Sequence, residues 1–238
     1  MRPGVVAVLV SASLLTLGAA PPGGPAARPL PDRMADTGGG TQLITAVAPG
    51  TGSTTGTVTW WDRRGAGDGR WVRAGSAPAR FGAGGLTEGG TRVQGTNTTP
   101  TGLYDLPYAF GIRAAPRGTE YRYRPVRQDS WWCQDNASRA YNRWTEPRPA
   151  DCRAAEAEHL VTYTAQYAHA LVVGFNYHRP VRGRGAGIFL HVNGRGATAG
   201  CVSVPAEAMR RILRWAEPDE RPHLAIGTTG GATAITRY

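Results

Sequence analysis

The sequence predicts a compact, mostly-β domain with a few short helices, and three observations lead to that prediction. Glycine and proline are abundant, at 33 and 18 of 238 residues, which favours a loop-rich β architecture over a helical bundle. Short runs of β-branched and aromatic residues alternate with glycine-rich turns along much of the chain. The clearest helical periodicity is confined to one segment, residues 205–216.

Strands are expected where such runs are long enough to cross a sheet. The first three runs cover residues 42–47, 57–62 and 71–74, and the second and third are expected to pair. Later strands are expected at residues 102–106, 120–124, 171–176, 187–192 and 224–228. The runs at 171–176 and 187–192 are apolar enough to be central strands.

The segment 205–216 is predicted to form a helix. Pro205 suits the first turn, and Glu207 can pair with Arg211 one turn later. The apolar side chains follow the i, i+3, i+4, i+7 spacing of one helix face: Met209, Ile212, Leu213 and Ala216. Because this helix begins shortly after Cys201, its dipole is expected to favour a thiolate there. A helix or irregular insertion is expected over 133–158, with residues 154–160 the most helical part.

The amino terminus predicts export from the cell. Residues 1–3 form a short cationic head, and residues 4–20 form an apolar run broken by small hydroxyl residues. That length fits a secretory signal better than a membrane-spanning helix, which needs about 20 apolar residues. We therefore divide the chain into a signal peptide or N-terminal anchor at 1–27, a flexible Pro/Gly-rich spacer at 28–40 and a folded domain at 41–238. Retention by an uncleaved anchor is the alternative to cleavage.

The charged residues of the chain limit the reactions and partners that can be considered for it. The formal net charge is +10, and all 27 basic residues are arginine. The absence of lysine excludes Ser-x-x-Lys acyl transfer, a P-loop and Schiff-base chemistry. The arginine excess is what GC-rich codon usage would produce, but it also makes anionic cell-surface polymers candidate partners. No zinc finger, helix-turn-helix or aromatic RNA-binding signature accompanies it, so we expect no nucleic-acid partner, and no obligate protein partner is indicated.

The three cysteines predict one disulfide and one free thiol. An exported protein meets oxidising conditions, in which exposed thiols pair. Cys133 and Cys152 flank a polar segment with little apolar periodicity, and a disulfide across it would stabilise the fold by about 3 kcal/mol. Cys201 is then left unpaired. It is either a buried structural thiol or a reactive one, and the histidine upstream favours the reactive thiol.

A candidate nucleophile and its base lie close together in the sequence. An apolar run ends in His191, and nine residues separate it from Cys201. An adjacent imidazole is the usual means of producing a thiolate near neutral pH. The loop between them is rich in glycine and can turn sharply, and backbone amides around Gly200 are candidate donors to a developing oxyanion. We therefore expect His191, Gly200 and Cys201 to form a catalytic centre.

Three motifs are more informative together than singly. Residues 99–104 are Thr-Pro-Thr-Gly-Leu-Tyr, followed by Ala-Phe-Gly at 109–111. Trp131-Trp132 precedes Tyr-Asn-Arg-Trp at 141–144, and Phe-Leu-His at 189–191 precedes Thr-Ala-Gly-Cys-Val at 198–202. In this order they resemble the YkuD-type L,D-transpeptidase domain of bacterial cell-wall enzymes, including secreted actinobacterial members, over roughly residues 40–228. The resemblance implies a β-sandwich-like catalytic domain with the upstream histidine as base and the cysteine as nucleophile.

This resemblance also implies a reaction and a place for it. Cys201 would form a thioester with a peptidoglycan stem peptide, and the amine of a neighbouring stem would attack it to form a 3→3 cross-link. The backbone carbonyl of Val192 is implied as the group that orients the imidazole. Water in place of the amine would make the protein an L,D-carboxypeptidase. The implied location is the cell wall or the extracellular space, and no cofactor is expected.

The chain departs from the family pattern at two positions. Ala199 stands where many members have a histidine, and Ser203 where many have asparagine or arginine. These departures leave open a catalytically decayed cell-wall-binding module. Retention of both His191 and Cys201 favours the enzyme.

Four residues are candidates for binding substrate: Tyr141, Asn142, Arg143 and Arg195. The first three lie in the segment similar to the substrate side of the family. Arg143 and Arg195 are also suited to bidentate pairs with substrate carboxylates. The tryptophans nearby form either a platform for sugar or peptide or a small core beneath a long loop: Trp131, Trp132 and Trp144.

A zinc site is the remaining alternative for the histidines. His169, His178 and His191 are sufficient in number for a catalytic metal. Their spacings match no established zinc motif, and no clustered carboxylates accompany them in the sequence. We therefore expect no metal.

Overall fold

A computed structural model describes residues 28–65 and 69–229, together with Met1. Apart from Met1, the predicted signal peptide or anchor at 1–27 lies outside the described residues. Within the described ranges, no helix has both the length and the hydropathy needed to cross a membrane.

Eleven strands form one continuous sheet in the order β4-β5-β14-β1-β2-β3-β13-β12-β11-β6-β7. Their bounds are β1 Gln42–Ala48, β2 Thr55–Arg64, β3 Arg70–Arg80, β4 Leu86–Glu88, β5 Thr99–Asp105, β6 Ala109–Gly111, β7 Tyr123–Pro125, β11 Ala170–Val172, β12 Phe189–Val192, β13 Val202–Val204 and β14 His223–Thr228. The mostly-β prediction is therefore confirmed, and β2 and β3 pair as expected.

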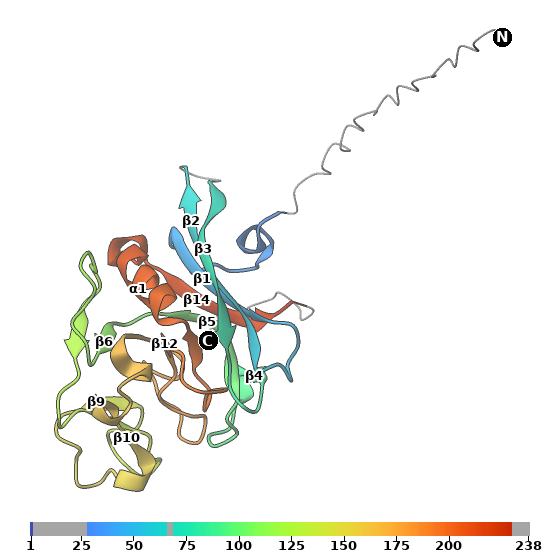
Figure 1. The fold of residues 1–238 in the computed structure, drawn as a ribbon. Coiled ribbons are helices and arrows are strands. Elements are labelled where there is room, and N and C mark those ends of the chain that lie inside the picture. Colours follow the sequence, from blue (N-terminus) through green and yellow to red (C-terminus); the bar gives the residue numbers. More distant parts are fainter. Residues whose placement is uncertain (2–27, 66–68, 230–238) are drawn as a thin grey trace.

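The long sheet encloses one main hydrophobic core. Ile44 of β1 and Val58 of β2 belong to the same buried cluster as Leu171 of β11 and Leu190 of β12, although these strands lie in different halves of the sheet. The two halves therefore face each other across a shared core, as in a β-sandwich. Figure 1 shows this part of the molecule with α1 lying against it.

The single α-helix in the described residues is α1, Ala206–Trp215, which confirms the helix predicted at 205–216. Its apolar stripe packs into the main core, where Met209, Ile212 and Leu213 are fully buried. Glu207 pairs with arginines on the exposed face. The remaining helices are short 3-10 segments: η1 Leu30–Arg33, η2 Gly89–Thr91, η3 Ala154–Glu156, η4 Leu160–Thr162, η5 Gln166–Ala168 and η6 Pro218–Glu220.

A second, three-stranded sheet is formed by the insertion, in the order β10-β8-β9. Its strands are β8 Trp131–Cys133, β9 Arg143–Thr145 and β10 Ala157–His159, and Figure 1 shows it projecting from the rest of the domain. Of residues 154–160, expected to be the most helical part of a helical or irregular insertion, Ala154–Glu156 form η3 and Leu160 begins η4, but β10 between them pairs with β8. Tertiary pairing overrides the local helix propensity of this alanine-rich stretch.

Two of the expected strands are shorter or displaced. The strand predicted at 120–124 begins only at Tyr123, and it forms the edge of the large sheet. The strand predicted at 171–176 ends at Val172. Beyond it the Gly174 amide donates to the Asp105 carbonyl, so the chain bends towards the end of β5.

The segment 28–40 packs on the domain, which differs from the flexible spacer that its composition predicts. Leu30–Arg33 forms η1, and Pro31 is buried. Met34 packs against the cluster that contains Leu43, Trp71 and Leu103. Burial of these apolar side chains offsets the entropy lost when the segment becomes ordered.

Candidate functional site

The pairing of β12 with β13 places His191 and Cys201 on one face of the sheet. The two strands are parallel, with His191 opposite Ser203. Side chains alternate between faces along a strand, so Cys201, two residues before Ser203, points to the same side as His191. The Phe189 amide hydrogen bonds with the Cys201 thiol at 3.3 Å, which agrees with this register.

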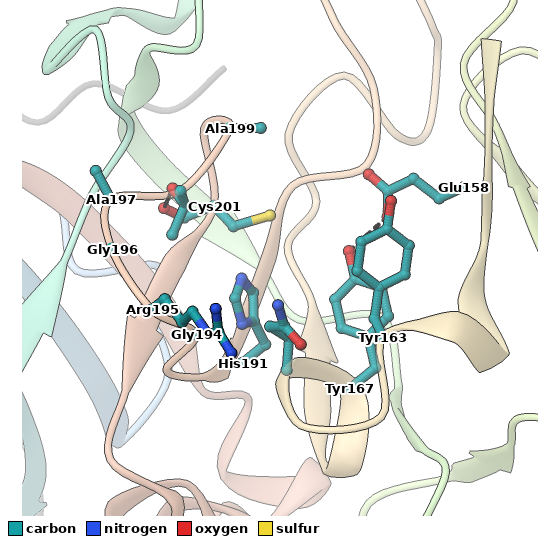
Figure 2. Close-up of a pocket in the computed structure, with 12 residues that line it drawn as sticks. Glu158, Tyr163, Tyr167, His191, Gly194, Arg195, Gly196, Ala197, Ala199 and Cys201 are labelled. Atoms are coloured by element: carbon teal, nitrogen blue, oxygen red, sulfur yellow. Dashed lines mark hydrogen bonds between the residues drawn. The ribbon is translucent and has the colours of Figure 1, made fainter. Parts of the chain in front are cut away.

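Both side chains open onto one pocket of about 210 Å³. Figure 2 shows His191 and Cys201 on one wall and Glu158, Tyr163 and Tyr167 on the other. The lining residues are Glu158, Tyr163, Gln166, Tyr167, His191, Gly194, Arg195, Gly196, Ala197, Thr198, Ala199 and Cys201. The pocket is therefore bounded by the glycine-rich loop on one side and by the end of the insertion on the other.

His191 is held as a neutral imidazole. Its unprotonated nitrogen, Nε2, is the one that does not bond to the backbone. Its Nδ1 lies 2.7 Å from the Val192 carbonyl oxygen. Because a carbonyl can only accept, Nδ1 carries the proton and Nε2 keeps its lone pair. Burial lowers the pKa of His191 to about 4, against the opposing effect of this hydrogen bond. The ring of Tyr167 packs edge-on against the imidazole, with centroids 5.6 Å apart.

Cys201 is a buried neutral thiol in this state. Its Sγ donates to the Gly187 carbonyl at 3.3 Å and accepts from the Phe189 amide at the same distance. Burial, together with a smaller contribution from the nearby Glu158, raises the pKa of the thiol to about 12. The pKa is raised although helix α1 begins only five residues later. Desolvation of the thiolate therefore outweighs the helix-dipole effect expected from the sequence. The resting pair is therefore thiol and imidazole rather than thiolate and imidazolium.

Two threonines hold the turn that carries Cys201. Thr198 Oγ1 donates to the Cys201 carbonyl at 2.6 Å and accepts from the Gly200 amide at 3.1 Å. Thr99 Oγ1, at the start of β5, also donates to the Cys201 carbonyl, at 3.3 Å. Since the Gly200 amide is already bound, the amides of Ala199 and Cys201 are the remaining candidate donors to an oxyanion in this turn.

Gly200 has no room for a side chain. Its φ of +137° lies in a region that residues with a Cβ rarely adopt. A Cβ there would also lie 2.9 Å from Nη2 of Arg92. Arg92 is only 6% exposed, and it donates to the carbonyls of Thr98 and Arg184 at 2.7 and 3.1 Å. A positive side chain therefore lies directly behind the turn that carries Cys201.

Two of the predicted substrate-binding residues support the site instead of lining it. Tyr141 is buried, and its hydroxyl donates to Gln94 and accepts from the Gly185 amide. Asn142 is also buried, and its Oδ1 accepts from the Gly187 amide and from Trp132 Nε1, each at 3.0 Å. Since the Gly187 carbonyl accepts from Cys201, Asn142 orders the segment on which the thiol rests.

The two predicted arginines lie in different places. Arg195 lines the pocket with Cys201. Arg143 lines a separate cavity of about 330 Å³, where its guanidinium lies over the ring of Tyr177 and donates to backbone carbonyls. Of the four predicted substrate-binding residues, only Arg195 is brought to the pocket.

Two tryptophans of the insertion, Trp132 and Trp144, belong to a small core, whereas Trp131 is partly exposed outside it. Trp132 is 1% exposed and packs against Phe189, with ring centroids 4.9 Å apart. Trp144 packs against Phe110, and Trp131 stacks on His159. The disulfide between Cys133 and Cys152, predicted from the sequence, is present and closes the insertion.

The histidines considered for zinc do not come together. His169 bonds to the Ala114 carbonyl, and His178 pairs with Asp105 at 2.8 Å. Among the described residues no group of three or more histidine, cysteine or carboxylate side chains is arranged to hold a metal ion.

Sequence reasoning missed the wall of the pocket opposite Cys201. Glu158 and Tyr167 reach it from the insertion and from η5, far from the catalytic motif in the chain. Arg92, behind Gly200, was missed as well. No periodicity or motif marks these three residues, because only the folded insertion and the loop before β5 bring them to the site.

Comparison with known families agrees with this geometry. A family model described as the YkuD L,D-transpeptidase catalytic domain matches residues 52–228. The match spans both His191 and Cys201 and covers well over half of the chain. A comparison with curated proteins gives no match.

Proposed function

The chain belongs to the YkuD family of L,D-transpeptidase catalytic domains, and on that premise we propose that it transfers peptidoglycan acyl groups through a thioester on Cys201 and forms 3→3 cross-links. Family membership implies a peptidoglycan substrate. The observation that carries the proposal is the pocket shared by a free thiol and an imidazole whose Nε2 is left unprotonated.

The first half-reaction begins from a neutral pair. As the sulfur approaches the L,D-peptide bond before a terminal D-alanine, Nε2 of His191 takes the thiol proton, because the imidazole is neutral and no thiolate is preformed. The Val192 carbonyl holds the ring in this tautomer and stabilises the imidazolium that forms. His191 then gives the proton to the departing amine, and the acyl group stays on Cys201.

Oxyanion stabilisation is assigned to the turn before β13. The amides of Ala199 and Cys201 are the donors we propose, with Thr198 and Thr99 fixing the peptide that carries them. The buried guanidinium of Arg92 adds a positive potential behind Gly200, in a region of low dielectric.

The proposed place of action is outside the cytoplasm, in the cell wall or the extracellular space. The cationic head and apolar run at the amino terminus support export, and a predicted signal or anchor is consistent with a wall substrate. Anionic wall polymers are proposed as a secondary partner, because the chain has a net charge of +10.

The test is product analysis with the purified full-length chain. Incubation with a disaccharide-tetrapeptide should give dimers with loss of D-alanine, detected by mass spectrometry. The Cys201→Ala and His191→Gln variants should form none, whereas His178→Gln, a largely exposed histidine paired with Asp105, should behave as the wild type.

Other outcomes select other functions. Tripeptide without dimers would identify an L,D-carboxypeptidase. If neither product formed and the protein still sedimented with cell walls, the decayed wall-binding module would replace the enzyme.

A further inference from the structure

Glu158 is the one carboxyl group among the residues that line the Cys201 pocket. It lies in β10, opposite Trp132 of β8. Directly opposite residues in a sheet share a face, so Glu158 points to the same side as this buried tryptophan. Its neighbour His159 turns the other way and stacks on Trp131. A carboxyl group therefore occupies a strand position whose partner belongs to the core.

Two short hydrogen bonds hold this carboxyl group in place. Tyr167 Oη donates to Oε2 at 2.5 Å, and Gln134 Nε2 donates to Oε1 at 2.6 Å. A carboxylate offers about four acceptor positions, so these bonds leave two of them for a ligand. Among the described residues no arginine or histidine pairs with Glu158. A partly buried carboxylate without a cation is costly, and a positively charged ligand would reduce that cost.

The position of Glu158 relative to Cys201 indicates what its carboxyl group can do. Figure 2 shows it across the pocket from Cys201, beside Tyr163 and Tyr167. An acyl group on Cys201 would therefore have His191 on one side and Glu158 on the other. A molecule that occupies the pocket beside the thioester would lie next to this carboxyl group.

We propose that Glu158 binds the ammonium group of the acyl acceptor and takes a proton from it, so that a neutral primary amine attacks the thioester on Cys201. The inference rests on the proposed acyl-transfer function and assigns its second half-reaction to a second base.

The step balances as follows. The acceptor ammonium gives one proton to the Glu158 carboxylate, and the nitrogen lone pair forms a bond to the thioester carbon. Nε2 of His191 removes the second proton from the nitrogen of the tetrahedral intermediate. The carbon–sulfur bond then breaks, the sulfur keeps the electron pair, and the imidazolium returns its proton to Sγ. Glu158 releases its proton to water, and the amide product departs.

The amine must lose its first proton before it can attack. A primary ammonium has a pKa of about 10.4 in water, so fewer than about one molecule in a thousand is nucleophilic at neutral pH. His191 takes up one proton in this step, from the nitrogen of the tetrahedral intermediate, so the first proton needs a second acceptor. Burial raises the pKa of Glu158 above its ordinary value, which makes its carboxylate a better proton acceptor than an exposed one.

The test separates the two half-reactions in the full-length protein. With donor alone, intact-protein mass spectrometry measures formation of the thioester; addition of an amine acceptor then measures transfer. In Glu158→Gln, formation should stay within about twofold of the wild type, and transfer should fall about 100-fold, so that the thioester accumulates. Glu156→Gln is the matched control, because Glu156 lies on the same insertion, does not line the pocket, and has a partly exposed carboxyl group that lies 3.9 Å from Arg153.

Hydroxylamine provides a second readout, since its nitrogen is already unprotonated at neutral pH. It should release the thioester equally fast from wild type and Glu158→Gln, because no proton need be removed before attack. A merely structural defect would slow both acceptors. If Glu158→Gln does not fold, Tyr167→Phe replaces it; loss of the hydroxyl that holds Oε2 should slow transfer to the amine but not to hydroxylamine.

Three results would overturn the inference. These are wild-type transfer to the amine in Glu158→Gln, loss of acylation in that folded variant, or equal slowing with hydroxylamine. Failure of the wild-type protein to form any thioester would instead remove the proposed function itself.

Discussion

Cys201 and His191 illustrate how burial sets the chemistry of single residues. Each group loses its hydration, and each pKa moves so as to disfavour the charged form, to about 12 for the thiol and about 4 for the imidazole. In the absence of substrate, the sulfur of Cys201 therefore keeps its proton at neutral pH. In the reaction that we propose, the thiol proton passes to His191 as the sulfur attacks, and the thiol gives up its hydrogen bond to the Gly187 carbonyl.

This burial predicts the pH dependence of thiol alkylation. A raised pKa means that the folded protein keeps the proton on sulfur through neutral pH. The rate of reaction of native Cys201 with iodoacetamide should therefore keep rising above pH 9, without a plateau. After unfolding, the same thiol should level off near the ordinary cysteine pKa of about 8.5. A plateau below pH 8 in the native protein would show that a preformed thiolate exists.

A substitution at Gly200 should be more harmful than one elsewhere in the loop. Gly200→Ala forces a Cβ into a φ of +137° and to 2.9 Å from Arg92 Nη2. We expect a loss of about 2 kcal/mol in the free energy of unfolding, measured by urea denaturation, together with loss of thioester formation. Gly196→Ala is the control, because a Cβ there would meet no atom within 4 Å. Equal stability of the two variants would contradict the steric argument.

At the scale of elements, the insertion is a wall of the active site rather than an appendage. β8 carries Cys133, and β10, which carries Glu158, pairs with it at Ala157. The disulfide to Cys152 therefore ties β8 to the segment that precedes β10, at a position paired with the neighbour of Glu158. Each strand of this sheet has only three residues, too few for independent stability.

Removal of the disulfide should accordingly reduce both stability and the order of the pocket. Replacing Cys133 and Cys152 by serine frees a loop of sequence separation 19, which should lower the free energy of unfolding by about 3 kcal/mol. Amide hydrogen exchange should increase first in β8 and β10. The measurement is made in a Cys201→Ala background to prevent thiol exchange, and unchanged protection of β10 would show that packing alone holds this wall.

For the whole molecule, charge is the property that acts beyond the site. The net charge of +10 is carried by arginine alone, and many of the guanidiniums are exposed. Such a surface attracts polyanions over about 10 Å at 0.1 M salt, independently of the fit of a substrate to the pocket. Retention on an anionic wall would keep the enzyme near its substrate.

Wall association should therefore depend on salt and not on catalysis. Cosedimentation of Cys201→Ala with cell walls should fall several-fold between 50 and about 500 mM salt, because the interaction is screened. Walls stripped of their anionic polymers should bind less protein at low salt. Binding that is unaffected by either change would assign retention to the peptidoglycan itself.

What the sequence determined by itself was local. The spacing of apolar residues in α1, the β-branched runs of β1 and β2 and the arithmetic of three cysteines each depend on neighbours in the chain, and the structure agrees with them. The order of the motifs around His191 and Cys201 was sufficient to predict the family.

Only the tertiary structure decided the environment of the site. Glu158, Tyr167 and Arg92 lie around Cys201 only in the folded chain. Part of the segment with the composition of a helix forms β10. Tyr141 and Asn142 lie outside the pocket and make hydrogen bonds that support it. The tertiary structure also reversed the expected ionisation of the nucleophile. Strand pairing between distant segments and the loss of hydration both depend on what surrounds a residue in space. Neighbouring residues in the sequence do not reveal those surroundings.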